Sequence, residues 1–344
     1  MILTDSPRLC YNRRALISAP RVSVVIPTHN GAATLAACLE SLQASSRPAY
    51  EIIVVDDASS DHSAEIAAQQ GCRVIRVDEN IGAARAKNRG AAAAAGDILF
   101  FTDDDVVVAR ETLEQIAENF GDARVVGVVG LLDAKIPFDD FPSNFKNLWM
   151  RFTYERLPRE HIGVFYTSIA AMRRETFQQL GGFDEHYGGA SIAEDTEFGQ
   201  RAWSAGNLLV LDPRVTATHW KHYTPRQVLV TDYLRARALV LMRLRKRGES
   251  FYTSVPLFYQ LAVPAIFGVV ACLVLVLFHP AFLAAFALLL VAFYALNATW
   301  LAYVARQRGA RFALTAALFQ PIDVIAVGLG MLGAVIEFAR GVKY

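Results

Sequence analysis

Cysteine is scarce in this sequence of 344 residues, and charged side chains are nearly missing from one end of it. The four cysteines lie far apart and form no C-x-x-C pair, which excludes a disulfide framework and a zinc knuckle. Residues 1–250 hold 60 Asp, Glu, Lys and Arg side chains, whereas residues 251–344 hold only 7. So uneven a distribution excludes a single soluble globular domain. A signal-peptide pattern is also missing, because Arg13 and Arg14 precede only a short apolar run.

The charges that are present divide the chain into three regions. Residues 1–223 carry 22 basic and 29 acidic side chains, whereas residues 224–247 carry 7 basic and 1 acidic. Because the folded body is acidic, the composition argues against a nucleic-acid partner, whose binding domain would be basic. We expect a folded cytoplasmic domain over residues 1–223, a basic amphipathic juxtamembrane helix over residues 224–250 and a transmembrane region over residues 251–344.

Two uncharged stretches of 24 residues, 255–278 and 281–304, predict membrane-spanning helices. Each would be about 36 Å long, enough to cross a hydrocarbon core of about 30 Å. A third stretch, 312–338, contains Pro321 and Asp323, so it is expected to be a kinked span or a re-entrant hairpin. Lys and Arg cluster before the first span and between the second and third, which predicts that these segments face the cytoplasm. The sequence therefore predicts a multi-pass protein of the inner or plasma membrane.

Two amphipathic segments connect the folded domain with this membrane region. Residues 224–247 combine an apolar stripe with five arginines along one helix, which predicts a helix lying on anionic headgroups. Residues 138–154 place Phe, Leu and Trp side chains at near-helical spacing. That aromatic stripe is expected either to rest on the bilayer or to be part of the core.

The front of the chain alternates predicted strands with predicted helices. The strands are expected at residues 22–27, 51–55, 73–77 and 97–102, and the helices at residues 33–42, 62–70 and 83–95. Repeated apolar strand–helix units predict a Rossmann-like α/β domain, with a mostly parallel sheet covered by helices on both faces. Ligands of such sheets bind outside the carboxyl ends of the strands. Polar residues follow three of these strands, at Thr28-His29-Asn30, Asp56-Asp57 and Asp103-Asp104-Asp105.

Three consecutive aspartates after a hydrophobic strand are the strongest indication of a metal. Adjacent carboxylates repel one another, and a divalent cation removes that repulsion. Asp103 and Asp105 are alternate side chains, so both could reach one hard cation such as Mg²⁺ or Mn²⁺, which also accepts diphosphate oxygens. From these residues alone, an acidic turn in which Asp103 caps the next helix remains an alternative.

Five motifs in order give the sequence a resemblance to the family-2 glycosyltransferases, which have the GT-A fold. The motifs are VSVVIPTHNGAATLAACLESL, EIIVVDDASSD, NIGAARAKNRGAAAAAGDILFFTDDD, GGFDE and AEDTEFGQRAWSAG, and the resemblance covers about residues 20–225. It implies a nucleotide-sugar donor, a divalent cation and inversion at the transferred sugar.

The resemblance also implies a role for particular residues. Asp103 and Asp105 match the metal-binding D-x-D, and His219 is expected near the metal or diphosphate, with His222 as a rival. Lys87 stands where relatives often have arginine and is expected near phosphate, although it and Arg85 could be solvated helix charges. The expected nucleotide-sugar contacts are Pro27, Thr28, His29, Asn30, Asp56, Asp57, Lys87 and Asp104.

Glu194 and Asp195 are the expected acid–base residues. The resemblance implies that Asp195 is the general base that deprotonates the acceptor, with Glu194 orienting it or the acceptor. Both would lie at a helix N-terminus, where carboxylates are favoured. A plain helix N-cap is the alternative for this pair.

The sequence lacks the Q-x-x-R-W motif that processive synthases of this family carry, which favours transfer of a single sugar. Together with the membrane region, this predicts a lipid or lipid-linked glycan acceptor at the cytoplasmic membrane face. One alternative is an exopolysaccharide or cell-surface glycan transferase that acts on a lipid-linked chain. Another is a catalytically silent nucleotide-sugar-binding scaffold in an envelope complex, which the presence of Asp103, Asp105 and Asp195 disfavours.

Overall fold

The front domain is built on one mixed sheet of eight strands, in the order β3-β2-β1-β4-β7-β6-β8-β5. The computed structural model describes residues 20–186, 193–245 and 250–341. The strands are β1 (Val22–Thr28), β2 (Glu51–Asp57), β3 (Arg73–Val77), β4 (Ile98–Phe101), β5 (Val106–Val108), β6 (Val125–Leu132), β7 (Ala170–Arg173) and β8 (Leu208–His219). Strands β1 to β4 pair in parallel, as the sequence predicts, whereas β7 and β5 pair antiparallel to their neighbours.

Helices pack against this sheet through apolar faces whose residues recur at helical spacing. Leu35, Cys38, Leu39 and Leu42 of the first helix, for example, are fully buried. The helices of the front domain are α1 (Leu35–Gln43), α2 (Ser63–Gln69), α3 (Ala83–Ala93), α4 (Thr112–Asn119), α5 (Phe141–Tyr154), α6 (Arg174–Gln179) and α7 (Glu194–Ser204). The predicted α/β architecture is confirmed, and the predicted bounds differ from the observed ones by only a few residues.

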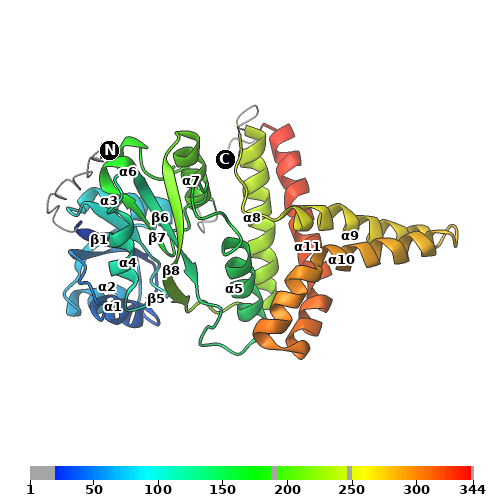
Figure 1. The fold of residues 1–344 in the computed structure, drawn as a ribbon, viewed down its shortest axis with the longest axis horizontal. Helices are drawn as coiled ribbons and strands as arrows, with labels where there is room; N and C mark the ends of the chain where they lie inside the picture. The colour runs from blue at the N-terminus through cyan, green and yellow to red at the C-terminus, as the bar shows by residue number, and fades with distance from the viewer. Residues whose placement is uncertain (1–19, 187–192, 246–249, 342–344) are drawn as a thin grey trace, which may run out of the picture.

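Four further helices form the C-terminal part: α8 (Pro225–Arg245), α9 (Leu257–Leu275), α10 (Phe282–Arg308) and α11 (Ala310–Ala339). Figure 1 shows α8 and α11 side by side, with the α9–α10 hairpin projecting away from them. Helices α9, α10 and α11 are long and apolar enough to cross a membrane. Their outward faces expose large apolar side chains, including Leu277, Leu288 and Leu318. Such a surface favours association with lipid.

Residues 312–338 were expected to form a kinked span or a re-entrant hairpin, and the structure of helix α11 excludes the hairpin. It is continuous over its 30 residues with Pro321 inside it, so the third apolar stretch is one helix and no re-entrant hairpin. The Asp323 carboxylate, expected to be costly in lipid, is buried between helices and accepts a hydrogen bond from the Tyr259 hydroxyl at 3.0 Å. Because the Asp323 carboxylate is shielded from lipid and hydrogen-bonded to Tyr259, a continuous helix does not expose an unpaired charge to lipid, which was the reason to consider a hairpin.

The aromatic stripe of α5 is a packing surface. Phe145, Leu148 and Phe152 are buried in one cluster with Trp300 of α10 and Ala316 of α11. This cluster joins the front domain to the apolar helices and fixes how they meet. Of the two expectations for residues 138–154, core packing is the one observed.

Candidate functional site

One cavity of about 660 Å³ lies at the carboxyl ends of β1, β2 and β4 and extends to α5 and α8. Most of the predicted site residues line it: Pro27, Thr28, His29, Asp57, Lys87, Asp103, Asp104, Asp105, Asp195 and His219. Asn30, Asp56 and Glu194 are outside this lining. The topology therefore brings together residues that are up to 192 positions apart, from Pro27 to His219.

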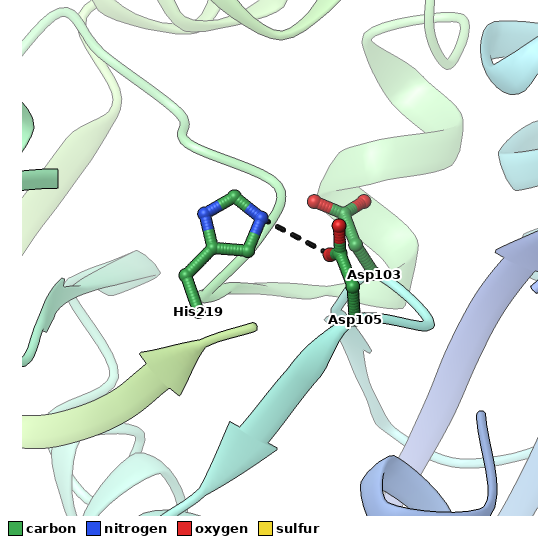
Figure 2. Close-up of side chains that lie close together, drawn as sticks. All are labelled: Asp103, Asp105 and His219. Atoms are coloured by element: carbon green, nitrogen blue, oxygen red, sulfur yellow. Dashed lines mark hydrogen bonds and ion pairs between the residues drawn. The ribbon is translucent and has the colours of Figure 1, made fainter. Parts of the chain in front are cut away.

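Asp103, Asp105 and His219 form a cluster able to hold a metal ion. One ligand atom from each lies within 4.8 Å of the other two. Figure 2 shows the imidazole directed at the Asp105 carboxylate with Asp103 beside it, and His219 Nε2 lies 3.0 Å from Asp105 Oδ1. Antiparallel pairing of β5 with β8, which sets Val106 opposite His219, produces this contact. Two carboxylates and one imidazole are a donor set that suits a divalent cation.

The aspartates of this turn are held by hydroxyl groups. Ser168 Oγ donates to Asp103 Oδ2 at 2.5 Å, and Thr28 Oγ1 donates to Asp104 Oδ2 at 2.5 Å. A Cβ at Gly31 would collide with the Asp104 carboxylate and the Thr28 hydroxyl, so a larger residue there would displace this hydrogen-bonded pair. Burial raises the pKa of Asp104 to about 7, with the neighbouring aspartates adding to the shift. Asp104 is therefore harder to ionise than an ordinary aspartate.

The two aspartates that end β2 have different surroundings. Asp57 lines the cavity, and its carboxylate accepts hydrogen bonds from the backbone N–H groups of Ile81 at 2.7 Å and Gly82 at 2.9 Å. Asp56 is fully buried, accepts from the Ser59 N–H at 3.1 Å and pairs with Arg76 at 3.1 Å. Asp57 thus shapes the rim of the cavity, whereas Asp56 supports the fold behind it.

His29 and Asn30 tie β1 to the loop after β2. The Nδ1 atom of His29 lies 2.6 Å from the Asp57 backbone carbonyl, so this nitrogen is the donor. The Asn30 side-chain carbonyl accepts from the Ser60 N–H at 2.8 Å, and its backbone has a φ of +57°. Asn30 therefore holds the loop in place, while His29 lies at the cavity itself.

Asp195 and Glu194 open helix α7, as predicted. Asp195 Oδ1 accepts from the Thr196 N–H at 2.6 Å, and Glu194 is fully buried with its Oε1 3.0 Å from the Lys87 ammonium. Burial and the adjacent Glu194 raise the pKa of Asp195 to about 6, against the opposing charges of Lys87 and Arg235. A carboxylate poised near 6 is suited to accept a proton at neutral pH.

The cavity lining also includes residues that the sequence did not single out as site residues. Lys146 and Met150 come from α5, Lys221 and Tyr223 follow β8, and Arg235 belongs to α8. Lys146 forms an ion pair with Asp232 of α8, and both side chains are buried. The sequence does contain a signal for this pair, because Lys146 is a cation within the aromatic stripe of residues 138–154 and Asp232 is the one acidic residue of residues 224–247.

Helix α8, which was expected to bind lipid headgroups, also contributes to the cavity. Arg235 was assigned to the headgroup-facing side of residues 224–247, but its side chain lines the cavity instead. The reason is that α8 packs between α5 and α11, so one of its polar faces is turned toward the site. Lys246 and Arg247, two further cations expected to bind headgroups, lie outside the described residues.

Comparisons with known proteins agree with this geometry. Residues 23–181 match the family described as glycosyl transferase family 2. The O-antigen chain rhamnosyltransferase WbaN of Salmonella anatum is 27% identical over 222 residues, which cover 60% of this chain and 69% of that protein. Glycosyltransferase AglE of Haloferax volcanii is 28% identical over 58% of this chain and 67% of its own length.

A solved structure supports the fold. The mannosyltransferase PcManGT from Pyrobaculum calidifontis, in complex with GDP-Man and Mn²⁺, superposes with a TM-score of 0.58 at 20% identity. The match covers 95% of this chain and 89% of that one, so it includes the C-terminal helices. Residues 23–181 therefore form a glycosyl transferase family 2 domain, and the chain has the GT-A fold with an apolar C-terminal region suited to membrane association.

Proposed function

We propose that this protein transfers one sugar from a nucleotide-sugar to a lipid or lipid-linked glycan, with inversion at the anomeric carbon and Asp195 as general base. The observation that carries this proposal is that Asp195 lines the same cavity as the Asp103–Asp105–His219 cluster. A base and a metal site in one cavity are the two elements that glycosyl transfer from a diphosphate donor needs. Likeness to O-antigen rhamnosyltransferases and to a GDP-Man-bound mannosyltransferase supports a deoxyhexose or hexose donor for cell-surface glycan synthesis.

The donor would occupy the part of the cavity nearest β1 and β2. Asp57, His29 and Thr28 line this end and offer acceptors and donors for a base and ribose. Asp103, Asp105 and His219 would hold a Mg²⁺ or Mn²⁺ ion. When bound, that ion neutralises the negative charge that grows on the departing diphosphate.

Asp195 would act on the acceptor. An acceptor hydroxyl oxygen attacks the anomeric carbon, the bond from that carbon to the diphosphate oxygen breaks, and the hydroxyl proton passes to the Asp195 carboxylate. The nucleoside diphosphate leaves with the bonding electron pair. Because attack comes from the face opposite the leaving group, the configuration of the sugar inverts. Glu194 and Lys87 position Asp195 through their buried ion pair rather than through contact with the acceptor.

The membrane region would hold this site at the cytoplasmic leaflet. We propose that α9 and α10 cross the bilayer as a hairpin, with the basic residues of 224–247 and Arg306, Arg308 and Arg311 on the cytoplasmic side. The turn between the two helices, at His279-Pro280, would then lie outside.

Helix α11 is proposed to stay beside α8 instead of crossing the bilayer as a third span. Arg237 Nε donates to Glu337 Oε1 at 2.8 Å, and Gly330 lies against the Tyr233 backbone. These contacts align the two helices in the same direction. Because α8 bears arginines along its length, a helix packed along it belongs at the membrane surface, where its apolar face meets lipid.

The full chain in nanodiscs containing membrane lipid extract tests this function. GDP-mannose and rhamnose nucleotides would be supplied with Mg²⁺ or Mn²⁺, and nucleoside diphosphate release and glycosylated lipids would be measured. We expect a single added sugar whose anomeric configuration is opposite to that of the donor. Retained configuration would overturn the inverting mechanism, and the absence of turnover with every donor would favour a nucleotide-sugar-binding scaffold.

A further inference from the structure

Four Lys and Arg side chains line the catalytic cavity, and they differ in what balances their charge. Lys87 pairs with Glu194 at 3.0 Å, Lys146 pairs with Asp232, and Lys221 lies 3.9 Å from Asp105 Oδ2. Within the part of the chain that the structure describes, no carboxylate lies within ion-pair distance of the Arg235 guanidinium. Its Nη1 instead contacts the Met150 thioether at 2.9 Å, which is a weak acceptor. Among the described residues, Arg235 is therefore the cavity cation without a directly paired carboxylate, although Asp232 and Asp195 act on its charge from a longer distance.

Arg235 belongs to a polar row along one face of α8. Gln227, Thr231 and Arg235 are four residues apart, so they lie above one another on the helix, and all three line the cavity. A different face of α8 packs on α11 through Tyr233 and Arg237. The row thus extends the catalytic cavity along the helix that joins the front domain to the membrane region.

The donor diphosphate has a separate site. Asp103, Asp105 and His219 can hold a cation for it, and Lys87 lines the same end of the cavity. Arg235 comes from α8 instead, and it lines the cavity together with Lys146 and Met150 of α5. An anion recognised by Arg235 therefore belongs to the second substrate.

We propose that Arg235 binds the phosphate of a polyprenyl phosphate or polyprenyl diphosphate that carries the acceptor. This inference rests on the proposed function, because it assigns the chemistry of the acceptor in the same site. The planar guanidinium matches phosphate oxygens with two parallel hydrogen bonds. Thr231 and Tyr223 add hydroxyl groups to the same wall. The phosphate anchors the lipid, and the group beyond it reaches Asp195.

Direct binding tests this assignment without turnover. Farnesyl phosphate would be titrated into the full chain in nanodiscs of neutral lipid, with EDTA present so that the metal cluster takes no part. Substitution Arg235→Gln is expected to weaken binding by about tenfold or more, because a charge-assisted hydrogen-bond pair is lost. Arg235→Lys should recover part of the affinity, and farnesol should bind the parent and Arg235→Gln equally.

Arg237→Gln is the matched control, because Arg237 lies two residues along α8 but pairs with Glu337 outside the cavity. It should bind farnesyl phosphate like the parent, with folding of each variant checked by thermal unfolding. Equal affinity of Arg235→Gln and the parent would overturn the proposal. Loss of affinity that appears only in nanodiscs with anionic lipid would also overturn it, since Arg235 would then recognise a bilayer headgroup.

Kinetics separate this proposal from the proposed function. In turnover assays, Arg235→Gln should raise KM for a prenyl-phosphate-linked acceptor about tenfold and leave KM for the donor unchanged. A raised donor KM would place Arg235 on the nucleotide diphosphate and refute the assignment. Arg235-dependent binding of farnesyl phosphate without turnover would refute the glycosyltransferase activity alone, whereas turnover without such binding would refute the acceptor site alone.

Discussion

The Lys87 ammonium donates to Glu194 Oε1 at 3.0 Å, and both side chains are almost completely buried. The same ammonium donates to Thr167 Oγ1 at 2.7 Å. The pair joins α3, which follows the Ile81-Gly82 segment held by Asp57, to the start of α7, which carries Asp195. One buried ion pair therefore couples the proposed donor side of the cavity to its proposed base.

Breaking that pair should cost both stability and activity. Lys87→Met leaves the Glu194 charge buried without its counterion, which typically destabilises a protein by about 3–5 kcal/mol. The double substitution Lys87→Met/Glu194→Gln should recover a large part of this loss, because neither charge then remains. Denaturant unfolding of the two single variants and the double variant measures the coupling. Additive losses would show that the two groups do not stabilise each other.

The activity should depend on the ionisation of Asp195. Burial and Glu194 raise the pKa of Asp195 to about 6, so the carboxylate is protonated and unable to act as base below that pH. We expect kcat/KM to rise with pH through about 6 at saturating metal. Glu194→Gln removes a like charge, so it should move this limb of the profile to lower pH. If the pH dependence of kcat/KM were the same in Glu194→Gln and the parent, the Glu194 charge would not be a cause of the raised pKa of Asp195.

Removal of Asp195 itself gives a sharper test of its role. Asp195→Asn should lower kcat by about 10²–10⁴-fold, which is the usual contribution of a general base, with donor affinity retained. Asp184→Asn is a suitable control, because Asp184 is a carboxylate that does not line the catalytic cavity. Equal turnover by Asp195→Asn and the parent would eliminate Asp195 as the base.

Chelation should abolish transfer, and Mg²⁺ or Mn²⁺ should restore it. Asp105→Asn and His219→Gln each remove one donor from the cluster, so Mn²⁺ affinity should fall on the order of 100-fold or more, beyond the loss typical of outer contacts. Titration followed by Mn²⁺ paramagnetic resonance measures this without turnover. Asp122→Asn, on an exposed turn, serves as the control. Full Mn²⁺ affinity in both cluster variants would exclude a metal at this position.

The adjacent aspartates Asp56 and Asp57 should respond differently to the same substitution. Asp56→Asn weakens a buried hydrogen bond and the contact with Arg76, so it should lower the free energy of unfolding by about 1–3 kcal/mol with little change in donor KM. Asp57→Asn loosens the backbone of Ile81 and Gly82 at the cavity rim, so it should raise donor KM. Unfolding curves and donor titrations of both variants give the comparison, and a reversed pattern would contradict it.

The placement of α11 predicts where the C-terminus lies. In the proposed arrangement, in which α11 stays beside α8 at the membrane surface, a C-terminal tag should be accessible from the same side as the front domain. A tag inserted at the turn between α9 and α10 should be accessible from the opposite side. Protease protection in oriented vesicles distinguishes the two, and a C-terminal tag on the outside would establish a third span.

Elements whose signals are local could be predicted from the amino-acid sequence. Alternating apolar runs predicted β1 to β4 and the helices between them, and long uncharged runs predicted the apolar helices. Because polar residues follow the strands of a parallel sheet, the meeting of Asp57 with Asp103 and Asp105 at one edge was also predictable. These inferences need only the periodicity and composition of each segment. Both are visible in its own residues, because the face that a segment buries must be apolar.

The remaining contacts of the site depend on strand pairing and helix packing, which involve residues far apart in the sequence. The family resemblance implied that His219 lies near the metal. The antiparallel pairing of β5 with β8 brings it to Asp105, which is 114 residues away, and no pattern near either residue specifies that pairing. In the sequence, Arg235 does not differ from the other cations of the basic helix. The packing of α8 between α5 and α11 turns the Arg235 side chain toward the cavity. Which face of an amphipathic helix meets a cavity depends on its neighbours, and those are selected by the packing of the whole chain.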